Sequence, residues 1–396
     1  MKGKVLRWAI HGVLTELFHN IFVRSLFRIR SRLFAKKQLE NDGQRCRVEP
    51  SKNELAVVTG ATGGIGSKIA RELAFRGYDV VIAARDSAKG LALAKELQQA
   101  LKKNSPFFNE TPYSNNGGKD LPTISFVEYH ADVPESALNV ASYIKAQSKG
   151  TEKRRLTLLI NNAGVMGKSK PLTMKVNLIG PAVLTIALLP LMVKPSGDNE
   201  KKVARVINVG SSAHLRATHV LDEKSVPSED GVSGSKQQSW IEALPDTEDK
   251  DLLVYAQSKL ALMQFSTLVR HWLPHSNHSE VQIFDAHPGL VWTPLLQNHI
   301  GDKGVSTLTR TGLARLIYKT STEGAQAILA AVDFDQSTPK RKGQVYFVNG
   351  KPNGYAAPES TSMNASFRLW RCVILPEIEG VVNLPEGWRM EASRET

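Results

Sequence analysis

The chain has 396 residues, of which 41% are hydrophobic, so it can bury one large core together with its extensions. Its formal net charge is +13, but much of that excess lies in the first 40 residues and no recognition motif accompanies it, which disfavours nucleic-acid binding. The two cysteines, Cys46 and Cys372, give no disulfide framework and indicate a reducing compartment.

The amino-terminal segment is basic and amphipathic. Residues 1–40 hold nine Lys or Arg against two acidic residues, and apolar side chains recur at helical spacing from Leu6 to Ile21. Their charge-free stretches are far shorter than the roughly 20 residues that span a bilayer. A helix lying on a membrane surface is one interpretation of residues 1–47. An organelle transit peptide and a helix packed on the main domain are the alternatives.

The first predicted strand, 55–59, is apolar and β-branched, as is typical of a strand buried in a parallel sheet. A glycine-rich turn from Gly60 to Gly66 follows it directly, and a helical pattern begins at Lys68. This order creates an anion site, because free N–H groups and the helix dipole point toward the ligand. Gly60 permits the tight turn, Gly64 the approach of a pyrophosphate, and Gly66 the close packing of helix on strand.

The second predicted strand, 79–84, ends at Arg85, without an acidic residue where a carboxylate would hold a ribose 2′-hydroxyl. A guanidinium can bind a 2′-phosphate there through two parallel hydrogen bonds. The position therefore favours NADP(H) over NAD(H), unless Arg85 is only a solvated surface charge.

Strands and helices alternate along the rest of the chain. The further predicted strands are 124–130, 156–160, 203–209, 281–286 and 344–348, and the helices are 87–103, 135–148, 174–193, 252–273 and 322–333. Such alternation implies parallel strands with helices on both faces of the sheet. We expect a single doubly wound α/β Rossmann domain with a parallel seven-stranded sheet over residues 48–350, followed by a C-terminal extension, 351–396. Its ligand site is expected at the carboxyl ends of the strands.

Tyr255 and Lys259 stand four residues apart in a predicted helix, so their side chains leave the same face one turn apart. A free phenol titrates near pH ~10. An ammonium one turn away stabilises the phenolate and lowers this pKa, so the pair can exchange a proton with an alcohol or a carbonyl oxygen. Alone, the same spacing is also typical of an ordinary amphipathic helix.

The glycine turn has the spacing Thr-Gly-x-x-x-Gly-x-Gly, and Asn161-Asn162-Ala163-Gly164 and Tyr255-x-x-x-Lys259 follow it. Over about residues 53–350 this set of motifs resembles the short-chain dehydrogenase/reductase family. Other matches occur in the family's order, namely Asp132, Asn177, Ser212, Pro288, Gly289 and Thr293. The resemblance implies a nicotinamide-dependent oxidoreductase whose cofactor carries out the hydride chemistry.

The resemblance also implies a catalytic set of Asn177, Ser212, Tyr255 and Lys259. Tyr255 would exchange the proton, and Lys259 would lower the pKa of Tyr255 while bonding the nicotinamide ribose. Ser212, with Ser211 as the alternative, would orient the substrate oxygen. Asn177 would hold a water of the proton relay, or else is a polar interruption of its helix.

The implied cofactor-binding residues lie in six segments. Asp132 and Val133 would flank the adenine, although Asp132 before Pro134 is also a plausible helix cap. The Pro288 loop would grip the nicotinamide carboxamide. The full set is Thr59, Gly60, Thr62, Gly63, Gly64, Ile65, Gly66, Arg85, Asp132, Val133, Asn162, Ala163, Gly164, Tyr255, Lys259, Pro288, Gly289 and Thr293. No metal site is expected.

The segments Ser211-Ser212-Ala213-His214 and Tyr255–Ala261 resemble the retinol-dehydrogenase-like branch of the family, including members acting on long isoprenoid alcohols and aldehydes. That branch implies a lipophilic retinoid, polyprenoid or steroid-like substrate. It also implies membrane association facing the cytoplasm, on the endoplasmic reticulum or a lipid droplet. A mitochondrion or plastid is the alternative location. The segment from Met166 to Asn177 is shorter than is usual in the branch, which leaves the shape of the pocket open.

Two insertions, 103–122 and 222–251, read as loops; the second is either a lid on the substrate pocket or an excursion with a docking helix. The tail from Pro358 packs on the core, or contacts a membrane or a second subunit in a homodimer. Two other functions remain open. One is a reductase of a small carbonyl or plastid pigment precursor, and the other a non-catalytic NADP(H)-sensing interaction protein.

Overall fold

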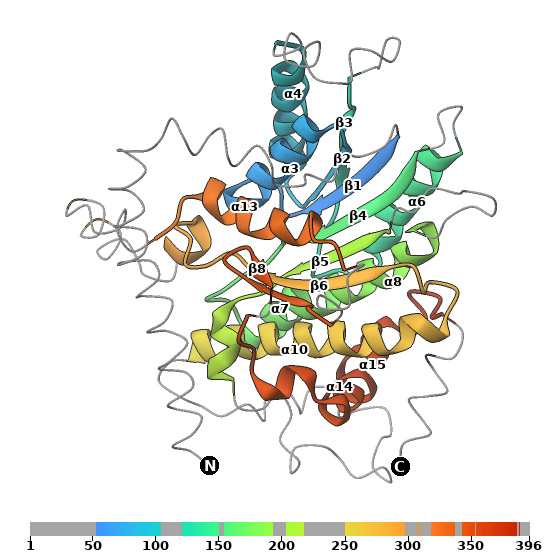
Figure 1. Cartoon of the computed structure of the whole chain (residues 1–396), viewed down its shortest axis with the longest axis vertical. Helices are drawn as coiled ribbons and strands as arrows, with labels where there is room; N and C mark the ends of the chain where they lie inside the picture. The colour runs from blue at the N-terminus through green and yellow to red at the C-terminus, as the bar shows by residue number, and fades with distance from the viewer. Residues whose placement is uncertain are drawn as a thin grey trace.

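The computed structural model describes residues 53–103, 121–149, 154–192, 203–217, 250–297, 306, 310, 318–336, 343–352, 354–385 and 388. Within them the chain forms an eight-stranded sheet in the order β3-β2-β1-β4-β5-β6-β7-β8 (Figure 1). The strands are β1 (Glu54–Thr59), β2 (Asp79–Ala84), β3 (Ile124–Glu128), β4 (Arg155–Asn161), β5 (Arg205–Val209), β6 (Gln282–His287), β7 (Tyr346–Val348) and β8 (Lys351–Pro352). The strand order reverses between β1 and β4, and open α/β sheets bind their ligands at such a switch point.

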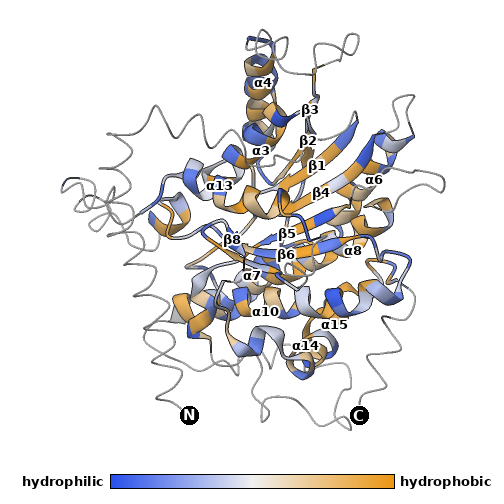
Figure 2. Cartoon of the chain, in the orientation of Figure 1, coloured by the Kyte–Doolittle hydropathy of each residue, from blue (hydrophilic) through white to orange (hydrophobic). Residues whose placement is uncertain are grey.

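The central strands are buried on both faces. Every residue of β1 and β2 is buried. Along β1, Leu55 and Val57 belong to one hydrophobic cluster, while Ala56 and Val58 belong to the other. Burial on both faces explains why these strands are continuous apolar runs rather than alternating ones. Figure 2 shows apolar residues concentrated in these strands.

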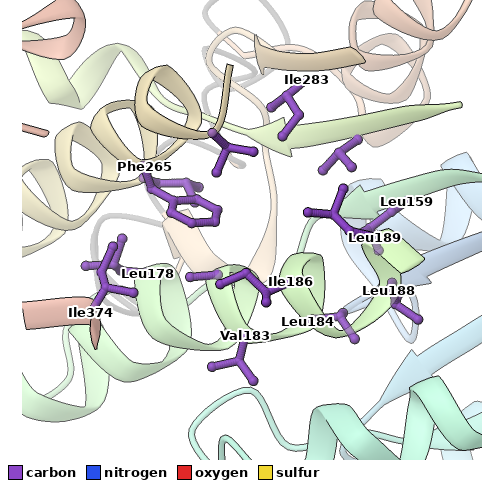
Figure 3. Close-up of a cluster of buried hydrophobic side chains, with 14 of the residues drawn as sticks. Leu159, Leu178, Val183, Leu184, Ile186, Leu188, Leu189, Phe265, Ile283 and Ile374 are labelled. Atoms are coloured by element: carbon purple, nitrogen blue, oxygen red, sulfur yellow. The ribbon is translucent and has the colours of Figure 1, made fainter. Parts of the chain in front are cut away.

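Helices cover both faces of the sheet, as predicted. α3 (Gly64–Arg76), α4 (Ser87–Lys103) and α13 (Ser321–Val332) pack on one face, and α6 (Ser136–Ser148), α8 (Gly180–Met192) and α10 (Lys250–Trp272) on the other (Figure 1). Figure 3 shows part of the cluster on the face of α8 and α10, which also contains Leu55 and Val57; Phe265 of α10 lies near Ile186 of α8 in it. The predicted doubly wound fold is confirmed.

The expected count of seven strands is wrong by one. β8 pairs with β7 in the antiparallel direction, through Val348 and Lys351. Asn349 and Gly350 between them both have positive φ, 54° and 79°. This is the two-residue hairpin loop for which Asn-Gly is the strongest sequence signal. The two-residue strand ends in a proline, which disfavoured a strand in the sequence.

The helix predicted at 174–193 begins earlier and contains a change of pitch. It runs as α7 (Lys170–Met174), a π-helical turn η4 (Lys175–Ile179) and then α8. The stretch 170–192 is long and apolar enough to cross a membrane, but its most apolar window is 83% buried within the fold. In this structure it is a core helix.

The C-terminal extension packs on α10. It contains η10 (Pro358–Thr361), α14 (Met363–Leu369), the π-helical turn η11 (Trp370–Ile374) and α15 (Leu375–Ile378). Trp272 of α10 lies 4.9 Å from Trp370 and 4.6 Å from Trp388 between ring centroids, and 6.1 Å from Phe367. Of the alternatives for the tail, packing on the core is therefore the one observed for residues 354–385. Residues 1–52, most of the 103–122 insertion and residues 218–249 lie outside the described part of the chain.

Candidate active site

A cavity of about 670 Å³ opens at the carboxyl ends of β1, β2, β4, β5 and β6. It brings together most of the residues predicted from the sequence. Those in its wall are Gly60, Thr62, Gly63, Gly64, Ile65, Arg85, Asp132, Asn162, Ala163, Gly164, Ser212, Tyr255, Lys259, Pro288, Gly289 and Thr293. Thr59, Gly66 and Asn177 are buried behind the wall, and Val133 is 45% exposed beside it.

The glycine turn is shaped to admit a ligand rather than side chains. Gly60 and Gly64 adopt positive φ values of 62° and 54°. A Cβ on Gly66 would lie 2.4 Å from Asn162 Nδ2 and 2.5 Å from the Gly60 carbonyl, so no side chain fits there. α3 begins at Gly64, four residues earlier than predicted, and its N-cap Gly63 supplies no side-chain cap. The N–H groups of the first turn are therefore left for an anion in the cavity.

Asn162 and Thr59 fix this turn from behind. The Asn162 side-chain amide donates to the carbonyls of Thr59 and Gly60 at 3.0 and 3.2 Å. The Thr59 hydroxyl accepts from the backbone N–H groups of Asn162 and Ala163 at 2.9 and 3.0 Å. Both residues therefore fix the conformation of the glycine turn, and Thr59 does so from a position outside the cavity.

The end of β2 presents two cations to the cavity. Arg85 is exposed there and lines the cavity, and Lys89, which sequence reasoning missed, also lines it with 71% of its side chain exposed. Asp86 also lines the cavity, but one of its oxygens accepts from the Lys89 backbone at 2.9 Å and the other pairs with the Lys89 ammonium at 3.0 Å. These bonds lower the pKa of Asp86. The only sequence signal for Lys89 is its place one turn into the helix after Arg85.

The loop after β6 is held by a buried lysine. Lys319 Nζ donates to the Pro288 carbonyl at 3.0 Å and to Asn349 Oδ1. A Cβ on Gly64 would lie 3.7 Å from Thr293 Cγ2, so Thr293 lies next to the glycine turn in the wall of the cavity. Sequence reasoning missed Lys319, because its contacts are with residues about 30 positions away.

Asn177 lies in the π-helical turn η4 and is fully buried. Its Oδ1 accepts from the Val165 N–H at 2.8 Å, and its Nδ2 donates to the Val165 carbonyl and to Ser258 Oγ, both at 2.9 Å. π-turns inside helices occur frequently at functional sites. Sequence reasoning gave a polar interruption of the helix only as an alternative and did not predict the π-turn. The Asn177 side chain links the loop after β4 to α10.

Tyr255 and Lys259 share one face of α10, with Lys259 Nζ 5.8 Å from the centre of the Tyr255 ring. Lys259 Nζ donates to the Val209 carbonyl at 2.9 Å, and burial lowers the pKa of Lys259 to about 8. Burial raises the pKa of Tyr255, and a hydrogen bond with Ser211 opposes this rise. The phenol pKa is thus shifted upward, opposite to the predicted effect of Lys259, because loss of solvent outweighs the other influences on it.

The serine that meets the phenol is Ser211. Its side chain hydrogen-bonds Tyr255 and accepts from the Ala213 N–H at 3.2 Å. Ser212 lines the same cavity and begins the short helix η5 (Ser212–Arg216). The geometry therefore favours the residue that the sequence gave only as the alternative. Because either serine can end the strand in sequence, only the turn geometry distinguishes them.

Apolar side chains also line the cavity. They come from five segments of the chain and comprise Val165, Met166, Val176, Leu215, Leu252, Leu290, Val291, Leu295 and Leu296. Within the described residues, no group of three or more His, Cys, Asp or Glu side chains could hold a metal ion.

Comparison with known proteins agrees with this site. Residues 54–110 match the family model of short chain dehydrogenases. Dehydrogenase/reductase SDR family member 13 of Homo sapiens is 30% identical over 324 residues, covering 81% of this chain and 72% of that protein. The chain belongs to the short-chain dehydrogenase/reductase family.

Within this family, the chain lies in the retinol-dehydrogenase-like branch. Polyprenol dehydrogenase of Mus musculus is 29% identical over 302 residues, covering 74% of this chain and 76% of that protein. Retinol dehydrogenase 12 of Homo sapiens is 28% identical over 326 residues, covering 80% of this chain and 84% of that protein. Among solved structures, an uncharacterised protein from Mycobacterium Paratuberculosis has a TM-score of 0.51 at 21% identity, covering 81% of this chain and 92% of that one, which supports the fold.

As a short-chain dehydrogenase/reductase, the chain is an oxidoreductase of alcohol and carbonyl groups in small molecules. A nicotinamide dinucleotide is the cofactor that the family implies, and the residues present fit it. The glycine turn excludes side chains, the first turn of α3 has uncapped N–H groups, and cations stand at the end of β2.

Proposed function

We propose that this oxidoreductase uses NADP(H) to interconvert a lipophilic alcohol and its aldehyde or ketone, with Tyr255 as the acid/base. One observation carries the proposal. A single cavity is lined by the glycine turn, by the cations at the end of β2, by Tyr255, Lys259 and Ser211, and by apolar side chains.

Arg85 and Lys89 support the preference for NADP(H). Both present exposed positive charge to the cavity at the end of β2, where a 2′-phosphate would be recognised. The neighbouring carboxylate of Asp86 is engaged by Lys89 and by the first turn of α4, so it is not turned to a ribose hydroxyl. Asp132 lines the cavity near this end and is proposed to flank the adenine, with Val133 at the rim.

The bound cofactor would supply or accept the hydride. Tyr255 gives its proton to the carbonyl oxygen in the reductive direction, and its raised pKa keeps the phenol protonated at neutral pH. Ser211 lies within hydrogen-bond reach of Tyr255, so its single O–H is placed to donate to the same substrate oxygen once substrate takes the place of the phenol as acceptor. We assign the orienting role to Ser211 in place of Ser212.

Lys259 stabilises the phenolate that remains. Its pKa of about 8 leaves it mostly protonated at neutral pH, and the Val209 carbonyl fixes its position. A Cβ on Gly164 would lie 3.4 Å from Asn177 Oδ1 and 3.5 Å from Lys259 Nζ. Gly164 therefore leaves the space between these two residues open, which supports a water held there by Asn177 in a proton relay to Lys259.

The apolar wall supports a lipophilic substrate. A side chain of isoprenoid type can replace water against Val165, Met166, Leu215 and Leu252, and burial of apolar surface drives such binding. The relatives named polyprenol dehydrogenase and retinol dehydrogenase 12 favour the same class. We therefore propose a retinoid or polyprenoid in preference to a small carbonyl.

Residues 1–40 are proposed to hold the protein on a membrane face toward the cytoplasm, where such substrates dissolve. Their basic excess and apolar stripe would favour anionic lipid surfaces. Sedimentation of the full chain with anionic vesicles but not with neutral ones, and less so at high salt, is the expected result. Absence of sedimentation with either kind of vesicle would contradict the proposal.

The test of function is oxidation of NADPH or NADH by the full-length protein in detergent micelles. The substrates offered are retinal, a polyprenal, a steroid ketone and a short aldehyde. We expect turnover with NADPH on the isoprenoid aldehydes, and far less with NADH. Turnover confined to the short aldehyde would overturn the lipophilic assignment. Tight NADPH binding without turnover of any of the four would favour a nucleotide-sensing interaction protein instead.

A further inference from the structure

His214 is a fully buried titratable side chain that the reaction just described does not use. It lies in η5, three residues after Ser211. Its Nδ1 is 2.5 Å from the Ser211 carbonyl, and its Nε2 is 3.2 Å from the backbone nitrogen of Ala357 in the C-terminal extension. A residue at the active serine is thus bonded to a segment 143 positions away in sequence.

These two partners fix the protonation state of the ring. The Ser211 carbonyl can only accept, so Nδ1 carries a proton and donates it. The Ala357 N–H can only donate, so Nε2 carries a lone pair and accepts. Burial lowers the pKa of His214 to about 4, the bond with Ser211 opposes this shift, and the nearby His287 adds to it. The ring is therefore neutral and directional at physiological pH.

The far end of this bridge is itself anchored to α10. Gln264 donates to the Glu359 carbonyl at 3.0 Å, and Thr267 donates to the Ser360 carbonyl at 2.8 Å. Ser360 Oγ donates back to the Ala357 carbonyl at 2.6 Å. The segment that contains Ala357 is thereby held to the helix that carries Tyr255.

The contacts form a closed circuit around the catalytic pair. From Tyr255 it runs along α10 to the extension, through Ala357 to His214, and back through Ser211 to the Tyr255 phenol. A circuit of this kind restricts the distance and angle between the two hydroxyls more than packing alone, because the links at His214, Ala357 and Gln264 are directional hydrogen bonds. Small displacements of reacting groups have large effects on rate.

We propose that His214 is a positioning residue that uses the C-terminal extension to set the Ser211 hydroxyl against Tyr255. This inference rests on the proposed function, since it presumes that Ser211 acts on the substrate. It makes residues 354–361 part of the support of the active site rather than an appendage of the domain.

Two substitutions separate the links of the bridge. His214→Gln places a carbonyl oxygen near the position of Nε2, so it keeps an acceptor for Ala357 but loses the donor to Ser211. His214→Asn places an amide N–H near Nδ1, so it keeps the donor to Ser211 but releases Ala357. For His214→Gln we expect kcat to fall about 10-fold to 100-fold while KM and NADPH affinity stay unchanged. His214→Asn should also lower kcat, because the link to Ala357 is lost, but by less than His214→Gln, because the donor to the Ser211 carbonyl remains.

The bridge itself is tested without turnover by hydrogen exchange of the Ala357 amide. We expect exchange to be faster than in wild type for His214→Asn and unchanged for His214→Gln. Equal protection in all three proteins would overturn the bridge. Thermal unfolding of the three proteins controls for loss of folding.

The role in positioning is tested by combining His214→Gln with Ser211→Ala. If His214 acts through Ser211, the double variant is no slower than Ser211→Ala alone. An equal further loss of kcat in the Ser211→Ala background would show a general structural effect and overturn the proposal, as would wild-type kcat in His214→Gln. Absence of turnover in the wild type would instead count against the proposed function.

Discussion

The two walls of the cavity are built in different ways. The cofactor wall, from Gly60 to Gly66, is made of backbone, with positive-φ glycines and uncapped N–H groups. The catalytic wall, at the start of η5 and on α10, is made of the side chains of Ser211, Tyr255 and Lys259. The first is damaged by adding atoms at Gly66, because a Cβ there would lie within 2.5 Å of Asn162 Nδ2 and the Gly60 carbonyl. The second is damaged by removing them.

The walls also differ in how they treat charge. The cofactor wall carries two exposed basic side chains, Arg85 and Lys89. The catalytic wall buries its titratable groups, which raises the pKa of Tyr255 and lowers that of Lys259. Substitutions in the first should change cofactor affinity, while those in the second should change kcat and its pH dependence.

Four substitutions, two in each wall, test this comparison. The largest effect among them is expected for Ser211→Ala. Loss of a hydrogen-bond donor to the reacting oxygen should lower kcat by about 10²-fold to 10³-fold. Ser212→Ala is the matched control, and should leave kcat nearly unchanged because the phenol meets Ser211. Steady-state kinetics with NADPH and the preferred aldehyde measure both. If Ser212→Ala were the slower variant, the assignment of the serine would be wrong.

Arg85→Ala should weaken NADPH binding and leave NADH binding unchanged. A lost charged hydrogen bond of about 1.5–3 kcal/mol corresponds to roughly 10-fold to 100-fold in Kd. Lys89→Ala should also weaken NADPH binding, because it removes a cation and releases the Asp86 carboxylate, which would repel a 2′-phosphate. Fluorescence titration with each nucleotide measures the difference. Parallel losses for NADPH and NADH would rule out recognition of the 2′-phosphate.

Gly66→Ala should destabilise the cofactor wall, because its Cβ would meet Asn162 Nδ2 and the Gly60 carbonyl. Overpacking of this kind costs about 1–3 kcal/mol of unfolding free energy. Gly63→Ala is the control, since nothing lies within 4 Å of its Cβ and its backbone is extended, with φ −173°. Urea unfolding of the two variants should differ accordingly. Equal stability would contradict the close packing of α3 on the turn.

The smallest change concerns pH. Burial lowers the pKa of Lys259 to about 8, so its charged form is present below that pH and is lost as pH rises through it. Carbonyl reduction, which needs this charge, should therefore decline above about pH 8 in the wild type. Lys259→Arg keeps its charge to higher pH, so the alkaline decline should move upward even if the rate is lower. An unchanged alkaline limb would show that another group controls it.

Much of the cofactor wall could be predicted because its signal is local. The order of strand, glycine turn and helix is contiguous in sequence, and the strands of the sheet are apolar runs because both of their faces are buried. Only local details differ, such as the start of α3 at Gly64 and the short hairpin strand β8 after Asn349-Gly350.

The support of the catalytic wall could not be predicted in the same way. Lys319, His214 and the contact of Ser211 with Tyr255 depend on segments that meet only after folding. The pKa of Tyr255 was predicted from the charge one turn away, whereas the structure shows that burial has the larger effect. Spacing in sequence reports which groups are neighbours, but it does not report how much solvent they lose.

The most direct test of the central claim is single-turnover oxidation of NADPH by wild type and Tyr255→Phe with an isoprenoid aldehyde. If Tyr255 donates the proton, the variant should lose about 10²-fold to 10⁴-fold in rate. Its NADPH affinity should stay unchanged, because the substitution removes only one oxygen from the catalytic wall. A Tyr255→Phe protein that oxidises NADPH as fast as the wild type would contradict the account.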